Sequence, residues 1–206
     1  MVIRDWSSDV CSSDLILERW GIDSNAVIGG DTKPKIVLLE KSNKRHILNK
    51  DQLLKDLKNE FLNAEVEMVV WDKMAMKDQI KTASQAWVMI GVPGTTIYNS
   101  FLIRPGGCIV TLCQILSEGS NCGNEKEILW DHFAHVRLRD YKDYEPEDLK
   151  WHPEVLDDLS KEQKESILAG KNVAYKKFWQ YWGSTDVFIR KERLFPLVNQ
   201  CLNEPF

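Results

Sequence analysis

Residues 35–71 read KIVLLEKSNKRHILNKDQLLKDLKNEFLNAEVEMVVW and hold the pattern that decides the fold. Residues 35–39 are a short apolar run flanked by charge, which is typical of a strand buried on both faces. Residues 49–61 instead repeat their apolar side chains at helical spacing. The repeating residues are Leu53, Leu54, Leu57 and Phe61. Residues 65–71 return to a strand pattern, so the stretch predicts strand, helix and strand in succession.

The same alternation continues toward the C-terminus. Asn49 is expected to cap the first helix, with Gln52 as its capping-box partner. Further elements are predicted as a helix over 76–86, a strand over 87–91, a helical stretch over 97–102 and a strand over 108–112. Strands and helices that alternate across short turns imply right-handed crossovers and a parallel sheet. The predicted fold class is therefore α/β, with a doubly wound parallel sheet.

The sequence changes character after the Gly/Ser/Asn-rich loop at residues 117–124. A short strand is predicted over 136–139, and helices over 126–135, 160–169, 173–182 and 185–200. Aromatic side chains gather in this part: Trp130, Trp151, Phe178, Trp179, Tyr181 and Trp182. Core packing of the C-terminal helices is favoured for them over a platform for stacking sugars. The predicted division is a doubly wound lobe over 16–141 and a C-terminal helical extension over 142–206.

The first fifteen residues do not read as part of this fold. Residues 5–15, DWSSDVCSSDL, match the translation of a common short-read sequencing adapter, so residues 1–15 are interpreted as a non-native segment. A genuine Ser/Asp-rich N-terminal turn is the alternative. On the first interpretation the native N-terminus is missing, and any signal or anchor segment would lie upstream of Ile16.

Composition excludes several classes of protein. The 206 residues are 43% hydrophobic and 28% charged, which excludes a disordered, collagen-like or coiled-coil chain. The net charge is -4, and the basic residues are spread along the chain, so nucleic acid is not expected as the main partner. The spacing of Cys108, Cys113, Cys122 and Cys201 fits no zinc template. Cys113 and Cys122 bracket the Gly/Ser/Asn loop, and a disulfide or two free thiols are equally compatible with that spacing.

Candidate binding residues follow the predicted strands, because ligands of doubly wound sheets bind beyond the carboxyl ends of the strands. The turn GVPGTT over 91–96 separates a strand from a helix, where backbone N–H groups can face an anion. An ordinary Gly-Pro turn without a ligand is the alternative. Arg45 follows the first strand and offers a planar fork for phosphate, unless it lies in a plain solvated loop. Gln79 lies on the helix over 76–86, where its amide could bond a base or face solvent.

Taken together, these segments resemble the carboxyl-terminal half of glycosyltransferase family 61. The family pattern runs S-R-x-x-x-R-x-I-x-N, then x-x-E-Q, then G-x-H-G-A-G-L-T-N, then F-x-x-P-G and a strand that ends in glutamate. The matching residues, in order, are Arg45, Ile47, Asn49, Asp78, Gln79, Gly91, Gly94, Asn99, Phe101, Pro105 and Gly106. The resemblance covers residues 35–112 and extends weakly to Tyr141.

Two positions depart from the family pattern. Pro93 stands where the family has the histidine of its H-G-A motif, and Thr111 stands where it has glutamate. The resemblance implies that groups at these two positions approach the diphosphate and the ribose. Thr95, Thr96 and backbone amides could compensate for the first change, and Glu118 could replace the ribose contact. Loss of a diphosphate donor would weaken stabilisation of the departing nucleotide.

The resemblance further implies one Rossmann-like lobe of a two-lobed, GT-B-type glycosyltransferase. It implies inverting transfer from a UDP-sugar to a glycan or glycoprotein acceptor, in the lumen of the Golgi or endoplasmic reticulum. The full-length protein would be a type II membrane protein anchored through its missing N-terminal segment. No Asp-x-Asp motif follows the sheet, so neither a metal nor another cofactor is expected. No catalytic base is named, because a base would come from the cleft or the other lobe.

Two other functions stay open at this point. The lobe could be a degenerate, non-catalytic binding or scaffold module of the same fold, which Pro93 and Thr111 both permit. It could also be an unrelated doubly wound domain that binds another phosphorylated ligand, because a fold does not fix a function.

Overall fold

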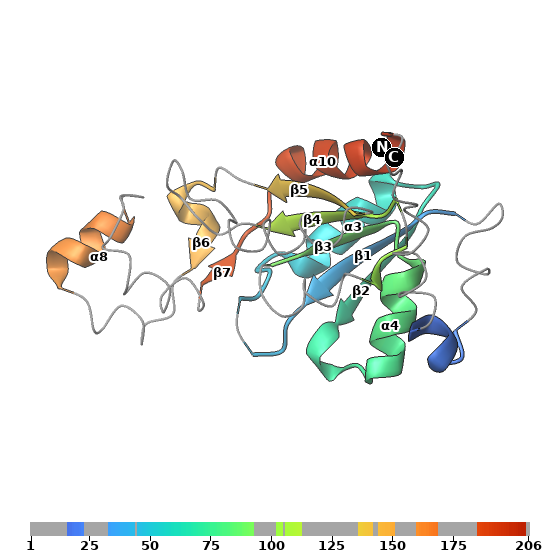
Figure 1. The fold of residues 1–206 in the computed structure, drawn as a ribbon. Coiled ribbons are helices and arrows are strands. Elements are labelled where there is room, and N and C mark those ends of the chain that lie inside the picture. The colour runs from blue at the N-terminus through green and yellow to red at the C-terminus, as the bar shows by residue number, and fades with distance from the viewer. Residues whose placement is uncertain are drawn as a thin grey trace, which may run out of the picture.

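A five-stranded sheet forms the centre of the computed structural model, which describes residues 16–22, 33–43, 45–92, 102–104, 106–112, 136–141, 144–150, 160–168 and 185–204. Its strands are β1 (Lys35–Glu40), β2 (Glu65–Val70), β3 (Val88–Gly91), β4 (Cys108–Leu112) and β5 (Arg137–Tyr141). Their spatial order is β2-β1-β3-β4-β5, and every neighbouring pair is parallel (Figure 1). The predicted α/β doubly wound fold is confirmed.

Helices cover both faces of this sheet. The helices α3 (Lys50–Glu60) and α10 (Lys191–Asn203) pack on one face, and α4 (Met76–Gln85) packs on the other. The remaining described elements are α8 (Lys161–Leu168), the 3₁₀ turns η1 (Trp71–Lys73) and η3 (Pro146–Asp148), and an antiparallel pair of β6 (Leu149–Lys150) and β7 (Asp186–Val187). No helix of the described residues is long and apolar enough to cross a membrane.

Two clusters of buried apolar residues, one on each face of the sheet, explain why these segments form strands and helices. Alternate strand residues point to opposite faces, so Leu38 lies in the core under α3 and α10 while Leu39 lies in the core under α4. On the first face, Leu53 and Leu57 of α3 are buried beside Leu194 and Val198 of α10. Burial on both faces requires the near-continuous apolar runs from which the strands were predicted.

A disulfide joins the C-terminal helix to the sheet. Cys108, the first residue of β4, is bonded to Cys201 in the last turn of α10, with 5.5 Å between the Cα atoms. Both cysteines are buried in the α3/α10 core. The spacing of cysteines in the sequence did not predict this pair, because its 93-residue separation carries no local signal.

Two local expectations were wrong. The helix predicted over 185–200 begins only at Lys191, because Asp186–Val187 pairs with β6 as a strand. Asn49 precedes α3 as predicted, but its side chain caps no backbone N–H of the helix, and Gln52 bonds Asp56 instead of completing a capping box. In both cases a long-range contact of residues 186–189 takes precedence over the local preference.

Several expectations fall outside the described residues. These are the adapter-like segment 1–15, the helices over 126–135 and 173–182, all but Leu102 of the stretch 97–102, the loop over 117–124, the aromatic cluster, and Cys113 with Cys122. The division into a lobe and an extension at residue 141 stays a prediction.

Candidate functional site

The strand order places a topological switch point between β1 and β3. The chain moves outward from β1 to β2 and then returns past β1 to β3, so the crossovers on either side of this point lead to opposite faces of the sheet. Glu40 and Gly91 are the last residues of these two strands. Ligands of open α/β sheets bind in the crevice beyond such strand ends. Figure 1 shows β6 and β7 on the side to which the strand arrows point.

The loop from β1 to α3 is anchored to its neighbours on both sides. At its start, the Ser42 backbone N–H and hydroxyl both donate to the carboxylate of Asp72 in η1. The side-chain hydrogen bond from Ser42 is the main reason that the pKa of Asp72 lies below its ordinary value. The loop is therefore held at the end of β2 before it turns toward α3.

Its other end is bonded to residues 186–187. The His46 backbone N–H donates to Asp186 Oδ1 at 2.8 Å, and the His46 carbonyl accepts from the Val187 N–H at 2.9 Å. The Leu48 N–H donates to the Val187 carbonyl at 2.7 Å, so Ile47 and Val187 form an isolated parallel bridge. A segment about 140 residues away in sequence thus completes the carboxyl edge of β1.

Arg45 lies between these two anchors with a φ of 60°. This left-handed conformation is uncommon for a residue with a Cβ and costs on the order of 1 kcal/mol. Such a conformation persists only where surrounding contacts hold it, which the bonds of Ser42 and His46 do here. The predicted phosphate-binding arginine is therefore fixed at the switch point.

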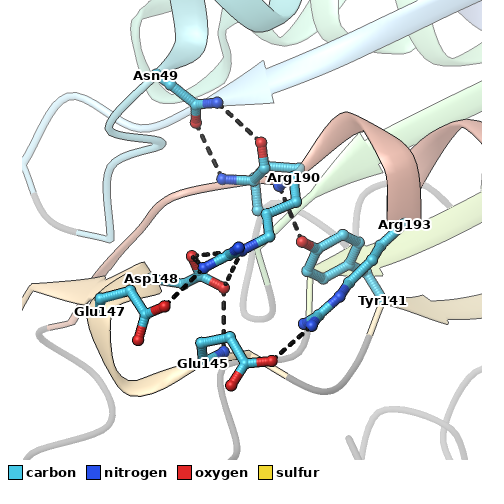
Figure 2. A network of polar contacts seen from close by, with 8 residues as sticks. Asn49, Tyr141, Glu145, Glu147, Asp148, Arg190 and Arg193 are labelled. Carbon is cyan, nitrogen blue, oxygen red and sulfur yellow. Dashed lines mark hydrogen bonds and ion pairs between the residues drawn. The ribbon is translucent and has the colours of Figure 1, made fainter.

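Asn49 uses both ends of its amide on the backbone of Ile189. Its Nδ2 donates to the Ile189 carbonyl at 2.8 Å, and its Oδ1 accepts from the Ile189 N–H at 3.0 Å (Figure 2). This pair of bonds joins the start of α3 to the segment that leads into α10. The predicted contact of Asn49 with a nucleotide sugar stays a prediction, and the structure gives its amide a positioning function.

Arg190 connects that segment to β5 and η3. Its backbone N–H donates to the Tyr141 hydroxyl at 2.9 Å, and its guanidinium donates to the buried carboxylate of Asp148 (Figure 2). The hydrogen bond to Asp148 is the main cause of the raised pKa of Arg190. Burial likewise raises the pKa of the Tyr141 hydroxyl. Residues 185–190, which we call the strap, are thereby fixed to both the sheet and the α3 loop.

The exposed rim of the same network adds two ion pairs. Glu147 pairs with Arg190 at 2.9 Å, and Glu145 pairs with Arg193 at 2.7 Å (Figure 2). The two glutamate side chains are 69% and 47% exposed. Solvent screening at such exposure leaves each pair with a small contribution to stability.

A buried carboxylate ends strand β1. Glu40 is 1% exposed, and its Oε1 lies 2.7 Å from Nδ1 of His46 and 4.0 Å from Nζ of Lys50. Its Oε2 accepts from the Ile47 N–H at 3.3 Å. The His46 side chain is 32% exposed, so the imidazole connects the buried carboxylate with the surface of the switch point. Neither residue was predicted from the sequence to be functional, since a charge after an apolar strand is usually solvated.

Gly91 and Thr111 occupy the same edge on neighbouring strands. They are register partners, and Thr111 in turn faces Asp140 on β5. A Cβ on Gly91 would lie 3.1 Å from Leu39 Cβ, so β1 and β3 approach each other closely here. Thr111 is buried, which places the predicted ribose position within the sheet and not on a loop.

The other predicted site residues divide into two groups. Gln79 lies on α4, and its amide donates to the carbonyls of Trp71 and Met74, so the structure shows it supporting η1. Pro93, Gly94, Thr95, Thr96, Asn99 and Glu118 lie outside the described residues. Among the residues that the structure does describe, no three His, Cys, Asp or Glu side chains are grouped so as to hold a metal ion.

The comparisons with known proteins agree with this geometry. Residues 13–110 match the model of the family described as Glycosyltransferase 61, and this range contains β1, β2, β3 and the first three residues of β4. The matched range supplies both strands of the switch point and the loop that carries Arg45. A comparison with curated proteins gave no significant match. Through this segment, which is just under half of the 206 residues, the chain is similar to glycosyltransferase family 61.

Proposed function

We propose that the chain is the nucleotide-sugar-binding lobe of an inverting glycosyltransferase with a UDP-sugar donor. The diphosphate of UDP lies between Arg45 and the turn over 91–96. The observation that carries the proposal is the position of the Arg45 loop and of Gly91 at the carboxyl ends of the two strands that flank the switch point.

The local charges and dipoles support an anionic ligand. Arg45 offers a planar fork of donors that matches two phosphate oxygens. The helix α3 begins at Lys50, directly after the loop, and the side chain of its N-cap residue, Asn49, makes no capping hydrogen bond. Uncapped N–H groups at a helix N-terminus attract negative charge. A diphosphate at this edge would therefore meet a guanidinium and the positive end of a helix dipole.

The transfer itself needs groups beyond this lobe. We propose a GT-B-type enzyme in which a hexosyl or pentosyl group passes from the UDP-sugar to a hydroxyl of a glycan or glycoprotein, without a metal ion. The acceptor hydroxyl attacks the anomeric carbon from the side opposite UDP, and a base from the second lobe takes its proton. On this proposal the present chain binds its donor but does not turn it over alone.

A non-catalytic binding or scaffold module is the second candidate. Its support is Thr111, which is 4% exposed and stands where the family pattern has glutamate. Pro93 likewise replaces the family histidine. If activity has been lost for long, restoring both groups with Pro93→His and Thr111→Glu in a full-length protein leaves transferase turnover at background. A gain in turnover would support the enzyme instead.

The disulfide supports a place in the secretory pathway. Buried disulfides such as Cys108–Cys201 form and persist in oxidising compartments. We therefore propose that the protein works in the lumen of the Golgi or endoplasmic reticulum, as a type II membrane protein when full length. Protease protection of the full-length protein in sealed microsomes tests this orientation, and digestion without detergent would contradict it.

Calorimetry with UDP tests the binding proposal. The 206-residue chain should release or absorb measurable heat with UDP at up to millimolar concentration, and Arg45→Ala should weaken binding on the order of tenfold or more. Lys55→Gln, an exposed charge removed from the same α3 helix, should leave binding unchanged. If the folded wild-type chain gives no heat with millimolar UDP, the proposal is wrong.

A further inference from the structure

We propose that His46, held by the buried carboxylate of Glu40, donates a hydrogen bond from its Nε2 to the diphosphate of the donor nucleotide. This inference rests on the proposed function and adds a residue to that site. His46 is then a binding residue, and Glu40 is a positioning residue that acts through it.

The contact with Glu40 fixes how the imidazole ring is used. Glu40 Oε1 lies 2.7 Å from His46 Nδ1, and a carboxylate can only accept there, so Nδ1 carries a hydrogen. The His46 side chain is 32% exposed. Its other nitrogen, Nε2, can therefore bond solvent or a ligand. A carboxylate behind a histidine orients the ring and determines which nitrogen faces outward, as in catalytic and metal-binding pairs.

In the part of the chain that the structure describes, two further charged side chains, Lys50 and Asp186, contact this pair. Glu40 is 1% exposed, and its second oxygen accepts from the Ile47 N–H at 3.3 Å. Lys50 of α3 lies 4.0 Å from Oε1, which is too far for a direct hydrogen bond. Asp186 of β7 contacts the backbone of His46, at 2.8 Å, and so holds the position of the residue. Among the described residues, His46 is a side chain that hydrogen-bonds Glu40 and is also partly exposed.

The position of His46 matches that of the diphosphate in the proposed function. His46 follows β1, which is paired in parallel with β3, and the GVPGTT turn follows β3. Strands β1 and β3 thus end side by side at the switch point, and residues 93–96 of the turn lie outside the described residues. In the proposed complex the ring donates from Nδ1 to the Glu40 carboxylate and from Nε2 to the phosphate. Charged residues next to this pair in contact or in sequence include Lys41, Arg45, Lys50 and Asp186, of which the first three are cations that also favour phosphate.

A set of variants separates this contact from mere support of the fold. His46→Asn keeps an amide near the place of Nδ1 but has no group at Nε2, and should weaken UDP on the order of tenfold while leaving uridine binding unchanged. Glu40→Gln should weaken UDP roughly threefold. Because Glu40 acts through His46, the double variant should bind UDP as His46→Asn does. Lys55→Gln, which removes an exposed charge from α3, is the control for a general effect of charge.

A direct measurement needs no substitution. In nitrogen-15 spectra of the histidine side chains, the Nε2 resonance of His46 should move to the position of a protonated nitrogen when UDP is added, and uridine should not move it. If His46→Asn fails to fold, this measurement alone decides. Two results would overturn the inference while the proposed function stands. In the first, the wild type binds UDP but the His46 resonance does not move. In the second, folded His46→Asn binds UDP with full affinity. No binding of UDP by the wild type would overturn both.

Discussion

Arg190 donates its Nε hydrogen to both carboxylate oxygens of Asp148, at 2.9 Å each. Asp148 is 2% exposed, and it also accepts from the Glu145 backbone N–H. Through this contact the strap over 185–190 is fixed to η3, and the strap in turn holds His46 and Asn49. The carboxyl edge of β1 therefore depends on a residue pair that lies outside the family match at 13–110.

Asp148→Asn should destabilise the protein by about 1–3 kcal/mol. The reason is that the buried amide N–H group of asparagine would face N–H donors of the Arg190 guanidinium. Glu147→Gln is the matched control, since Glu147 contacts the same arginine from a side chain that is 69% exposed. That variant should stay within about 0.5 kcal/mol of the wild type. Urea unfolding followed by tryptophan fluorescence measures both. Equal losses in the two variants would contradict a buried anchor at Asp148.

The disulfide between Cys108 and Cys201 should contribute about 2–5 kcal/mol, because it closes a long loop in the unfolded chain. The double variant Cys108→Ala/Cys201→Ala should unfold at correspondingly lower urea concentration. Peptide mapping without reduction should find the two cysteines joined when the protein is made in an oxidising compartment. Free thiols at both positions in such a preparation would show that the link is absent.

The left-handed backbone conformation of Arg45 can be tested by comparing the stability of two variants. Arg45→Ala and Arg45→Gly both remove the guanidinium, but only alanine retains the cost of a Cβ at a φ of 60°. We expect the glycine variant to be more stable than the alanine variant by about 1 kcal/mol. Both variants should bind UDP more weakly than the wild type, and to the same extent. Equal stability of the two would mean that Arg45 adopts an ordinary conformation in solution.

The hydrogen bond from Ser42 to Asp72 should affect how the free energy of unfolding changes with pH in the acid range. Because Ser42 lowers the folded-state pKa of Asp72, its contribution is present above the ordinary aspartate pKa and is lost as the pH falls through the lowered value. Ser42→Ala should raise the pKa of Asp72 toward its ordinary value and reduce stability at neutral pH more than in acid. Ser42→Thr keeps a hydroxyl and should behave as the wild type. A carboxyl carbon-13 titration that shows the same Asp72 pKa in Ser42→Ala would rule the bond out.

The sheet was predictable from the sequence because its signals are local. The apolar run over 35–39 and the helical spacing of Leu53 and Leu57 each reflect burial within one element, and the structure contains the strand and helix that they predict. Gly91 and Arg45 could be placed at the ligand edge for the same reason, since each follows a predicted strand.

The rest of the site depends on contacts without a local signal. The two-residue strand β7 is too short to show a period, and it forms because β6 and the β1–α3 loop pair with it. For the same reason Asn49 was expected to cap α3, whereas its amide bonds Ile189, 140 residues away. The burial of Glu40 likewise results from packing around the switch point, which an isolated glutamate after a strand does not reveal.

Amide chemical-shift mapping with UDP tests the central claim most directly. When UDP is added to the 206-residue chain, the largest shifts should fall in residues 41–49 and 91–96, the two segments that leave β1 and β3 at the switch point. The helix α8, at residues 161–168, serves as the internal control and should not respond. No shifts at millimolar UDP, or shifts centred on a segment other than these two, would contradict the account.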